Sequence, residues 1–297
     1  MDYMINLLQT LLFVLLFPIF LFSQSFSIDD DLDRSIYFDS IPTKVISLAP
    51  NITEMIYQLN VGDKLVGNTK YCYFPEDAKS VSKVGDILTI NYEKIIELQP
   101  DVIFLTVEGN QKHVYEKLMN LGFKVFVSNP RDYEGIKKTF KDLGKVFGKR
   151  QLAKIKIQEW DSTLAQIKSD SKNFTRKTVM ILVELNPIMI AGKNTFINTY
   201  IETCNMKNFS EEAQLNYPIF SRETVIERDP DIIVYPSSGK ESIKTLTDTY
   251  PEWASLSAIK NNRVFFVDRD LYFRPGPRFI EALTDFYSRL AKTSSID

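Results

Sequence analysis

The sequence has 297 residues, with 36 Lys and Arg against 38 Asp and Glu, one histidine and two cysteines. The near-neutral net charge of −2 argues against nucleic-acid binding, which needs a basic surface. The content of 44% hydrophobic residues is typical of a globular chain rather than a disordered one. A single histidine excludes a histidine-rich metal site, and two cysteines cannot form a disulfide scaffold.

Residues 1–25 are typical of a secretory signal peptide. The apolar run Leu7 to Phe22 is shorter than the roughly 20 residues that span a membrane, and small residues follow it, so we expect cleavage after Ser25. The first six residues lack Lys and Arg, which leaves a retained anchor as the alternative. No cysteine precedes Cys72, so we expect no lipid attachment at the cleavage site. A secreted protein without a lipid needs an outer membrane to retain it, which favours the periplasm.

Residues 26–43 form an acidic lead-in that contains Asp29, Asp30, Asp31 and Asp33. A calcium loop is one interpretation of these carboxylates. However, the glycine and the final glutamate of an EF-hand loop are missing. We therefore expect a solvated tail that precedes the first lobe.

Two segments repeat one plan at an offset of 130 residues. Residues 91–105 read NYEKIIELQPDVIFL, residues 221–235 read SRETVIERDPDIIVY, and six of the fifteen positions are identical. Each predicts a short helix that ends at a Pro-Asp pair, because proline cannot continue a helix. The apolar, β-branched run that follows is typical of a strand buried on both faces of a parallel sheet.

Further strands and helices alternate along the chain. The predicted strands are residues 44–48, 102–106, 124–127, 178–182, 232–236 and 263–267, and the predicted helices between them are 52–59, 114–121, 133–146, 195–203 and 277–290. This alternation predicts an α/β fold of two Rossmann-like lobes with mostly parallel sheets, over residues 44–150 and 173–297.

Residues 151–172 connect the lobes without a glycine or a proline. Their apolar residues fall near helical spacing, which predicts one stiff helix of about 20 residues, roughly 30 Å long. We therefore expect the lobes to move little against each other. The cleft between them is the expected ligand site, because pockets favour domain interfaces and the carboxyl ends of parallel strands.

The chain also carries a family resemblance. It is carried by an ordered set of motifs: VISLAPNITE (45–54), DKLVG (63–67), YCYFP (71–75), KVG (83–85), SRE (221–223) and RPGPR (274–278). This set resembles the class III periplasmic substrate-binding proteins of ABC importers, most closely the cobalamin-binding type, over about residues 44–290. The resemblance implies a monomeric carrier, not an enzyme, that holds a large metal-containing molecule and delivers it to a permease in the inner membrane.

The resemblance places the permease-docking carboxylates at Glu93 and Glu223. The residues support this independently, since the two glutamates occupy equivalent positions of the repeat and therefore one lies on each lobe. Each also falls in the first turn of a predicted helix, where the helix dipole favours a negative charge. The alternative is that both are ordinary first-turn carboxylates.

The resemblance also places ligand contacts at Tyr71, Tyr217, Asp270 and Arg274. Aromatic faces with a few polar groups suit a large, partly flat corrin. The alternative for the tyrosines is core packing, and Arg274 could instead brace its loop through Asp268 or Asp270. Ile87 stands where the cobalamin-binding type has a tryptophan, which keeps an iron-siderophore or haem ligand open as the alternative.

Two asparagines complete the expected ligand site. Asn51 follows the first strand of the first lobe, where a helix-capping role competes with ligand contact. Asn186 holds the matching place at a strand end of the second lobe, where a plain loop role competes. We expect no catalytic residue, no metal site and no cofactor other than the transported ligand.

Two other classes of function compete with a binding protein. A secreted α/β hydrolase would need a nucleophile and a base, but the sequence has no G-x-S-x-G motif and His113, expected to be solvated, is its one imidazole. A receptor or adhesin fragment would have its cleft filled by protein side chains.

The two cysteines are not expected to form a disulfide. In some members of the family the equivalent of Cys204 pairs with a cysteine of the last helix. The last predicted helix of this chain has no cysteine, so we expect Cys72 and Cys204 to be unpaired.

Overall fold

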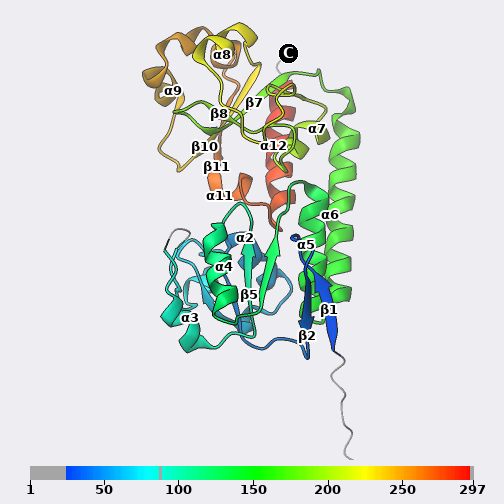
Figure 1. The fold of residues 1–297 in the computed structure, drawn as a ribbon. Helices are drawn as coiled ribbons and strands as arrows, with labels where there is room; N and C mark the ends of the chain where they lie inside the picture. The colour runs from blue at the N-terminus through cyan, green and yellow to red at the C-terminus, as the bar shows by residue number, and fades with distance from the viewer. Residues whose placement is uncertain (1–24, 87–88, 295–297) are drawn as a thin grey trace, which may run out of the picture.

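The computed structural model describes residues 25–86 and 89–294, so the expected signal peptide, apart from Ser25, and Ile87 lie outside the described residues. Two α/β lobes are joined by the long helix α6 (Arg150–Asp170), which lies along one side of the molecule (Figure 1). The predicted fold of two lobes with mostly parallel sheets is therefore confirmed.

The first lobe contains a four-stranded sheet in the order β4-β3-β5-β6, in which all neighbours pair in parallel. Its strands are β3 (Val45–Ser47), β4 (Leu65–Asn68), β5 (Val102–Thr106) and β6 (Val125–Ser128). Its helices are α2 (Pro50–Gln58), α3 (Tyr92–Leu98), α4 (Lys112–Asn120) and α5 (Tyr133–Val146). All five residues of β5 are buried, as expected for a central parallel strand that is covered on both faces.

The second lobe contains a five-stranded sheet in the order β11-β10-β7-β8, with β9 also paired to β7. Its strands are β7 (Thr178–Glu184), β8 (Met189–Ile190), β9 (Lys207–Asn208), β10 (Ile232–Ser237) and β11 (Val264–Asp268). Its helices are α7 (Asn198–Thr203), α8 (Arg222–Arg228), α9 (Ile243–Thr249), α10 (Ser257–Lys260), α11 (Arg269–Tyr272) and α12 (Phe279–Ser294). The strands pair in parallel except for β7 with β8.

The sequence repeat has the same structure in both lobes. α3 and α8 begin after side-chain caps, since Asn91 Oδ1 accepts a hydrogen bond from Lys94 N at 2.8 Å and Ser221 Oγ accepts one from Thr224 N at 3.2 Å. Both helices end at a residue with left-handed backbone, immediately before the proline. β5 and β10 then follow at the same offset, so the two lobes place α3 and α8 equivalently.

α6 packs against both lobes rather than bridging them through solvent. It contacts α5 of the first lobe and α12 and α7 of the second. α5 and α6 approach closely because Gly144 has no side chain, and a Cβ there would lie 2.6 Å from the Cβ of Ala153. The ring of Trp160 packs 4.8 Å from that of Phe140 at the same interface. The connecting helix is thus part of the core of the molecule.

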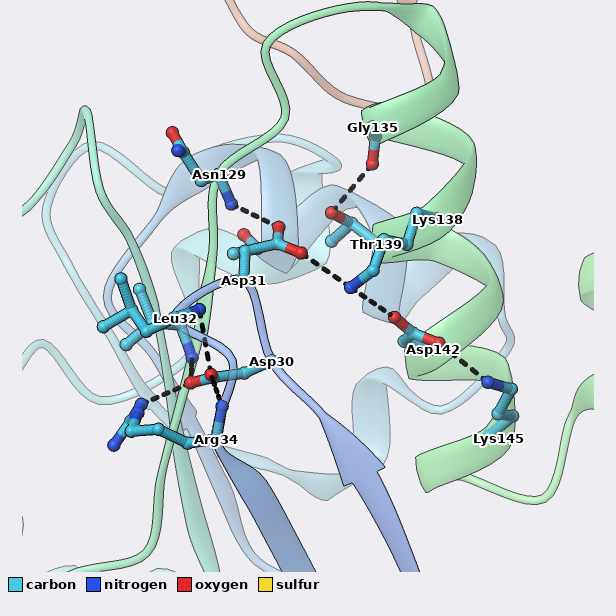
Figure 2. A network of polar contacts seen from close by, with 12 residues as sticks. Asp30, Asp31, Leu32, Arg34, Asn129, Gly135, Lys138, Thr139, Asp142 and Lys145 are labelled. Carbon is cyan, nitrogen blue, oxygen red and sulfur yellow. Dashed lines mark hydrogen bonds and ion pairs between the residues drawn. The ribbon is translucent and has the colours of Figure 1, made fainter.

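The acidic lead-in differs from the solvated tail expected from the sequence. It forms an antiparallel hairpin of β1 (Phe26–Asp29) and β2 (Ser35–Phe38), which packs Ile28 and Phe38 into the core of the first lobe. The prediction was wrong because the carboxylates have partners far along the chain. Asp30, only 3% exposed, pairs with Arg34 and accepts hydrogen bonds from three backbone N–H groups, including that of Val127 (Figure 2).

Asp31 anchors the same hairpin to the end of β6. Its carboxylate accepts a hydrogen bond from Asn129 N at 2.6 Å and pairs with Lys138 Nζ at 2.6 Å (Figure 2). Lys138 in turn contacts Asp142 on α5 at 3.1 Å. Across the described parts of the chain, no cluster of three or more His, Cys, Asp or Glu side chains could hold a metal ion, and these aspartates are held by cations and amides instead.

Candidate functional site

A cleft of about 690 Å³ lies between the two lobes. From the first lobe it is lined by the start of α2, by Tyr71 and by the loops that follow β5 and β6. From the second lobe it is lined by Asn216, Tyr217 and the segment that follows β11. The loops after β5, β6 and β11 are at the carboxyl ends of parallel strands, where α/β sheets place their ligands. The cleft is therefore the candidate binding site.

The structure brings together five of the six residues expected to contact the ligand. Tyr71 and Asn51 line the cleft from the first lobe, and Tyr217, Asp270 and Arg274 line it from the second. Tyr71 remains 40% exposed, so its ring is not a core residue. Their placement supports the expected site, while their contact with a ligand stays a prediction.

Asn186 does not line this cleft, contrary to expectation. It is exposed and lies in the turn between β7 and β8. The expectation placed Asn186 at a strand end beside the cleft, but after Glu184 the chain turns back and β8 pairs antiparallel with β7. The chain after β7 is therefore a hairpin turn rather than a loop over the cleft.

The sequence interpretation missed an acid–base pair in the cleft, Glu108 and Arg131. The Arg131 guanidinium lies 2.9 Å from the Glu108 carboxylate, and both residues line the cleft beyond the ends of β5 and β6. The hydroxyl of Tyr217 donates a hydrogen bond across the cleft to Glu108 at 3.3 Å. Partial burial and the charge of Glu108 both raise the pKa of Tyr217, so this hydroxyl stays protonated and able to donate. Their position directly after predicted strands was the available signal.

Arg274 makes more contacts within the protein than the resemblance implied. Its guanidinium lies 2.8 Å from Asp270 and 3.1 Å from Glu54, and it also donates to the carbonyl oxygen of Tyr71 at 3.3 Å. The expected alternative, a brace through Asp270, is therefore present. Glu54 comes from α2 of the first lobe and was not singled out from the sequence.

Arg278 completes this contact between the lobes. It donates to both carboxylate oxygens of Glu54, at 3.0 and 2.9 Å. Burial alone would lower the pKa of Arg278, but the hydrogen bond and the charge of Glu54 raise it. The Arg278 guanidinium also lies 4.1 Å from the ring centre of Phe74, and that of Arg274 lies 4.9 Å from the ring centre of Tyr73.

Asn51 also joins the lobes. It is the second residue of α2, and Ala49 is the cap, so the capping role that was the alternative to ligand contact is wrong. Its side-chain amide instead donates to the carbonyl oxygen of Pro275 at 3.1 Å. Asn51, which is only 4% exposed, thereby connects α2 to the loop that carries Arg274.

Glu93 and Glu223 lie outside the cleft. Both are exposed, in the first turns of α3 and α8. These helices lie in different lobes and on the side of the molecule away from α6 (Figure 1). The pKa of Glu223 is lowered by a hydrogen bond from its own backbone N–H and by the Ser221 hydroxyl, which keeps the carboxylate charged.

The two cysteines are unpaired, as expected, and both are also buried. Cys72 Sγ lies 3.3 Å from the hydroxyl of Thr69 and is not among the residues that line the cleft. Burial raises the pKa of Cys204 to about 12. His113 is exposed at the start of α4, which agrees with the expected solvated role.

Comparison with known proteins identifies the family. The family model described as periplasmic binding protein matches residues 45–271. An ABC transporter substrate-binding lipoprotein of Bacillus subtilis, YvrC, is 31% identical over 267 residues, which are 87% of this chain and 83% of that protein. The vitamin B12-binding protein of Photorhabdus laumondii is 28% identical over 93% of this chain and 94% of that protein.

Solved structures agree with this assignment. The periplasmic vitamin B12-binding protein BtuF of Vibrio cholerae superimposes with a TM-score of 0.74 at 25% identity, over 85% of this chain and 98% of that one. The haem-binding protein RhuT of Roseiflexus sp. RS-1 has a TM-score of 0.75 at 20% identity, over 84% and 98%, and so shares the fold.

Within residues 25–86 and 89–294, no helix has the length and apolar character needed to cross a bilayer. The family match reaches from the first lobe into the second and covers all but three of the residues that line the cleft, Phe273, Arg274 and Pro275. The proteins of this family bind a substrate for transport and carry out no reaction on it. The chain is therefore a member of the periplasmic binding protein family, a substrate-binding component of an ABC transporter and not an enzyme.

Proposed function

We propose that this protein captures a corrinoid, cobalamin, in the cleft between its lobes and delivers it to an ABC import permease in the inner membrane. The observation that carries the proposal is a cleft with aromatic rings and balanced charges. Tyr71, Tyr217 and Phe273 supply the aromatic rings. The volume of about 690 Å³ falls in the range of small-molecule sites.

The charges of the cleft favour a neutral polar ligand over an anionic one. The ionised side chains that line it form two acid–base pairs, Glu108 with Arg131 and Asp270 with Arg274. Each pair offers hydrogen-bond acceptors beside donors, which is what the amide groups around a corrin ring require. An anionic ligand would gain most from cations that are not already neutralised. Relatives named vitamin B12-binding proteins support the same ligand.

The second candidate ligand, with the same mechanism, is an iron-siderophore or haem. One observation favours it: two arginines, Arg131 and Arg274, line the cleft. Each guanidinium group has paired N–H donors that can bind a carboxylate of the ligand. Both arginines would first have to leave their acidic partners. We rank the corrinoid first for that reason.

For delivery, we propose that Glu93 and Glu223 pair with basic residues of the permease. Support comes from their exposure, their equivalent places in the two lobes and the lowered pKa of Glu223. The two carboxylates lie outside the cleft and leave it free for the ligand. We propose that the carrier acts as a monomer in the periplasm, without a lipid anchor.

A titration of the mature protein, residues 26–297, tests the ligand. Cyanocobalamin, haemin and a ferric siderophore are each added while ligand absorbance and the fluorescence of Trp160 and Trp253 are followed. We expect micromolar or tighter binding of cyanocobalamin alone. Tyr217→Ala should weaken it by up to about tenfold, the loss of one ring contact to the ligand, while Tyr37→Ala on the exposed hairpin should not. Binding of haemin alone would assign the second ligand, and no binding at all would overturn the proposal.

A further inference from the structure

Glu54 is a buried carboxylate of the first lobe that is held by two arginines of the second lobe. Its side chain is 2% exposed. Glu54 accepts hydrogen bonds from Arg274 Nη1 at 3.1 Å, from Arg278 Nε at 3.0 Å and from Arg278 Nη2 at 2.9 Å. These contacts join residues 220 and 224 positions apart, so no local pattern requires them.

The carboxylate lies behind the ligand site and not in it. Arg274 lines the cleft, whereas Glu54 and Arg278 line a separate cavity of about 380 Å³. A ligand in the cleft therefore meets the guanidinium of Arg274 and not the carboxylate of Glu54. Glu54 can influence the ligand only through Arg274.

The four charged side chains that meet at this contact carry no net charge among themselves. Glu54 and Asp270 contribute two negative charges, and Arg274 and Arg278 contribute two positive ones, with each arginine within 3.1 Å of a carboxylate oxygen. Asp268 and Glu281 also act on Arg278 electrostatically. The positive charge of Arg274 at the cleft surface is therefore offset from behind.

We infer that Glu54 is a positioning residue that determines which ligand charge the cleft accepts. The carboxylate neutralises Arg274 and fixes the orientation of its guanidinium group. The cleft therefore selects neutral polar ligands and rejects anionic ones. The same contacts hold the two lobes at the spacing that forms the cleft. This inference deepens the proposed function and relies on it for the ligand site alone.

Two substitutions separate a selectivity role from a purely structural one. Glu54→Gln keeps the shape of the side chain but removes one negative charge from behind the cleft. Arg278→Gln breaks the same contact between the lobes but removes one positive charge. A purely structural role predicts that both variants change ligand binding in the same direction. A selectivity role predicts opposite changes in the preference between an anionic and a neutral ligand.

The experiment measures dissociation constants of haemin and cyanocobalamin for the wild type and both variants. Glu54→Gln should bind haemin about tenfold more tightly than the wild type, the effect of one unit charge at roughly 6 Å in a partly hydrated site. Arg278→Gln should shift the preference toward cyanocobalamin. The matched control is Glu116→Gln on α4, which removes the same charge from an exposed pair with Lys112 and should change neither constant.

The outcomes distinguish this inference from the proposed function. If the wild type fails to bind cyanocobalamin, the proposed ligand is wrong, but a gain of haemin binding in Glu54→Gln still supports the role of Glu54. If Glu54→Gln binds haemin no better than the wild type, or if both variants shift the preference in one direction, the inference is overturned. Thermal melts accompany the titrations and show whether each variant folds. If Glu54→Gln fails to fold, Glu54→Asp is used instead, and it should keep the wild-type ligand preference because it retains the negative charge.

Discussion

Replacing Asp30 by alanine should destabilise the first lobe, although the residue lies in a segment whose composition is that of a solvated tail. The Asp30 carboxylate accepts hydrogen bonds from the backbone N–H groups of Leu32, Arg34 and Val127, at 3.0, 3.1 and 3.2 Å, and pairs with the Arg34 guanidinium. Alanine removes all of these acceptors at once. The hairpin would then lose the polar attachment to β6 that Asp30 provides and keep the one made by Asp31.

The expected loss follows from the burial of each donor. The N–H of Val127 is buried and would remain unsatisfied, which costs roughly 1–3 kcal/mol. The N–H groups of Leu32 and Arg34 lie in a partly exposed turn where water replaces the carboxylate, so each costs about 0.5–1 kcal/mol. The sum is about 3 kcal/mol, which is a large part of the ~5–15 kcal/mol stability of a typical domain.

Urea unfolding followed by tryptophan fluorescence measures this loss. Trp160 is 6% exposed and packs on α5 of the first lobe, so its emission reports on the affected core. The matched control is Asp29→Ala on the same hairpin, which removes an exposed carboxylate bonded to the hydroxyl of Ser35 and should cost less than ~0.5 kcal/mol. If Asp30→Ala and Asp29→Ala had equal free energies of unfolding, the attachment of the hairpin would be refuted.

Two further predictions concern the docking carboxylates and the thiols. Glu93→Ala and Glu223→Ala should leave ligand affinity unchanged and impair uptake into cells, since both side chains lie outside the cleft; a fall in affinity would show that their role is misassigned. Cys72 and Cys204 should not react with Ellman's reagent at pH 8 in the native protein and should both react in denaturant, because both are buried and the raised pKa of Cys204, about 12, keeps its thiol protonated. A thiol that reacts rapidly in the native protein would contradict this.

Local sequence patterns were enough to predict the fold class and the equivalence of the lobes. The repeat predicted α3 with β5 and α8 with β10 because a helix ended by Pro-Asp and a β-branched run is a local pattern. Residues 151–172 predicted α6, which ends at Asp170 and continues as a short 3-10 turn. The cleft was also expected, since parallel strands place their carboxyl ends at one edge of a sheet.

The positions of the charged side chains, in contrast, depend on contacts between residues that are far apart in the chain. Periodicity depends on interactions within a few residues, so it does not reveal that Asp30 accepts from Val127, 97 residues away, or that Glu54 holds Arg274 at a separation of 220 residues. The sequence pattern of a solvated acidic run is the same whether its carboxylates meet water or buried donors. Desolvation makes the difference, because a carboxylate is buried only where the fold supplies cations and N–H groups to satisfy it.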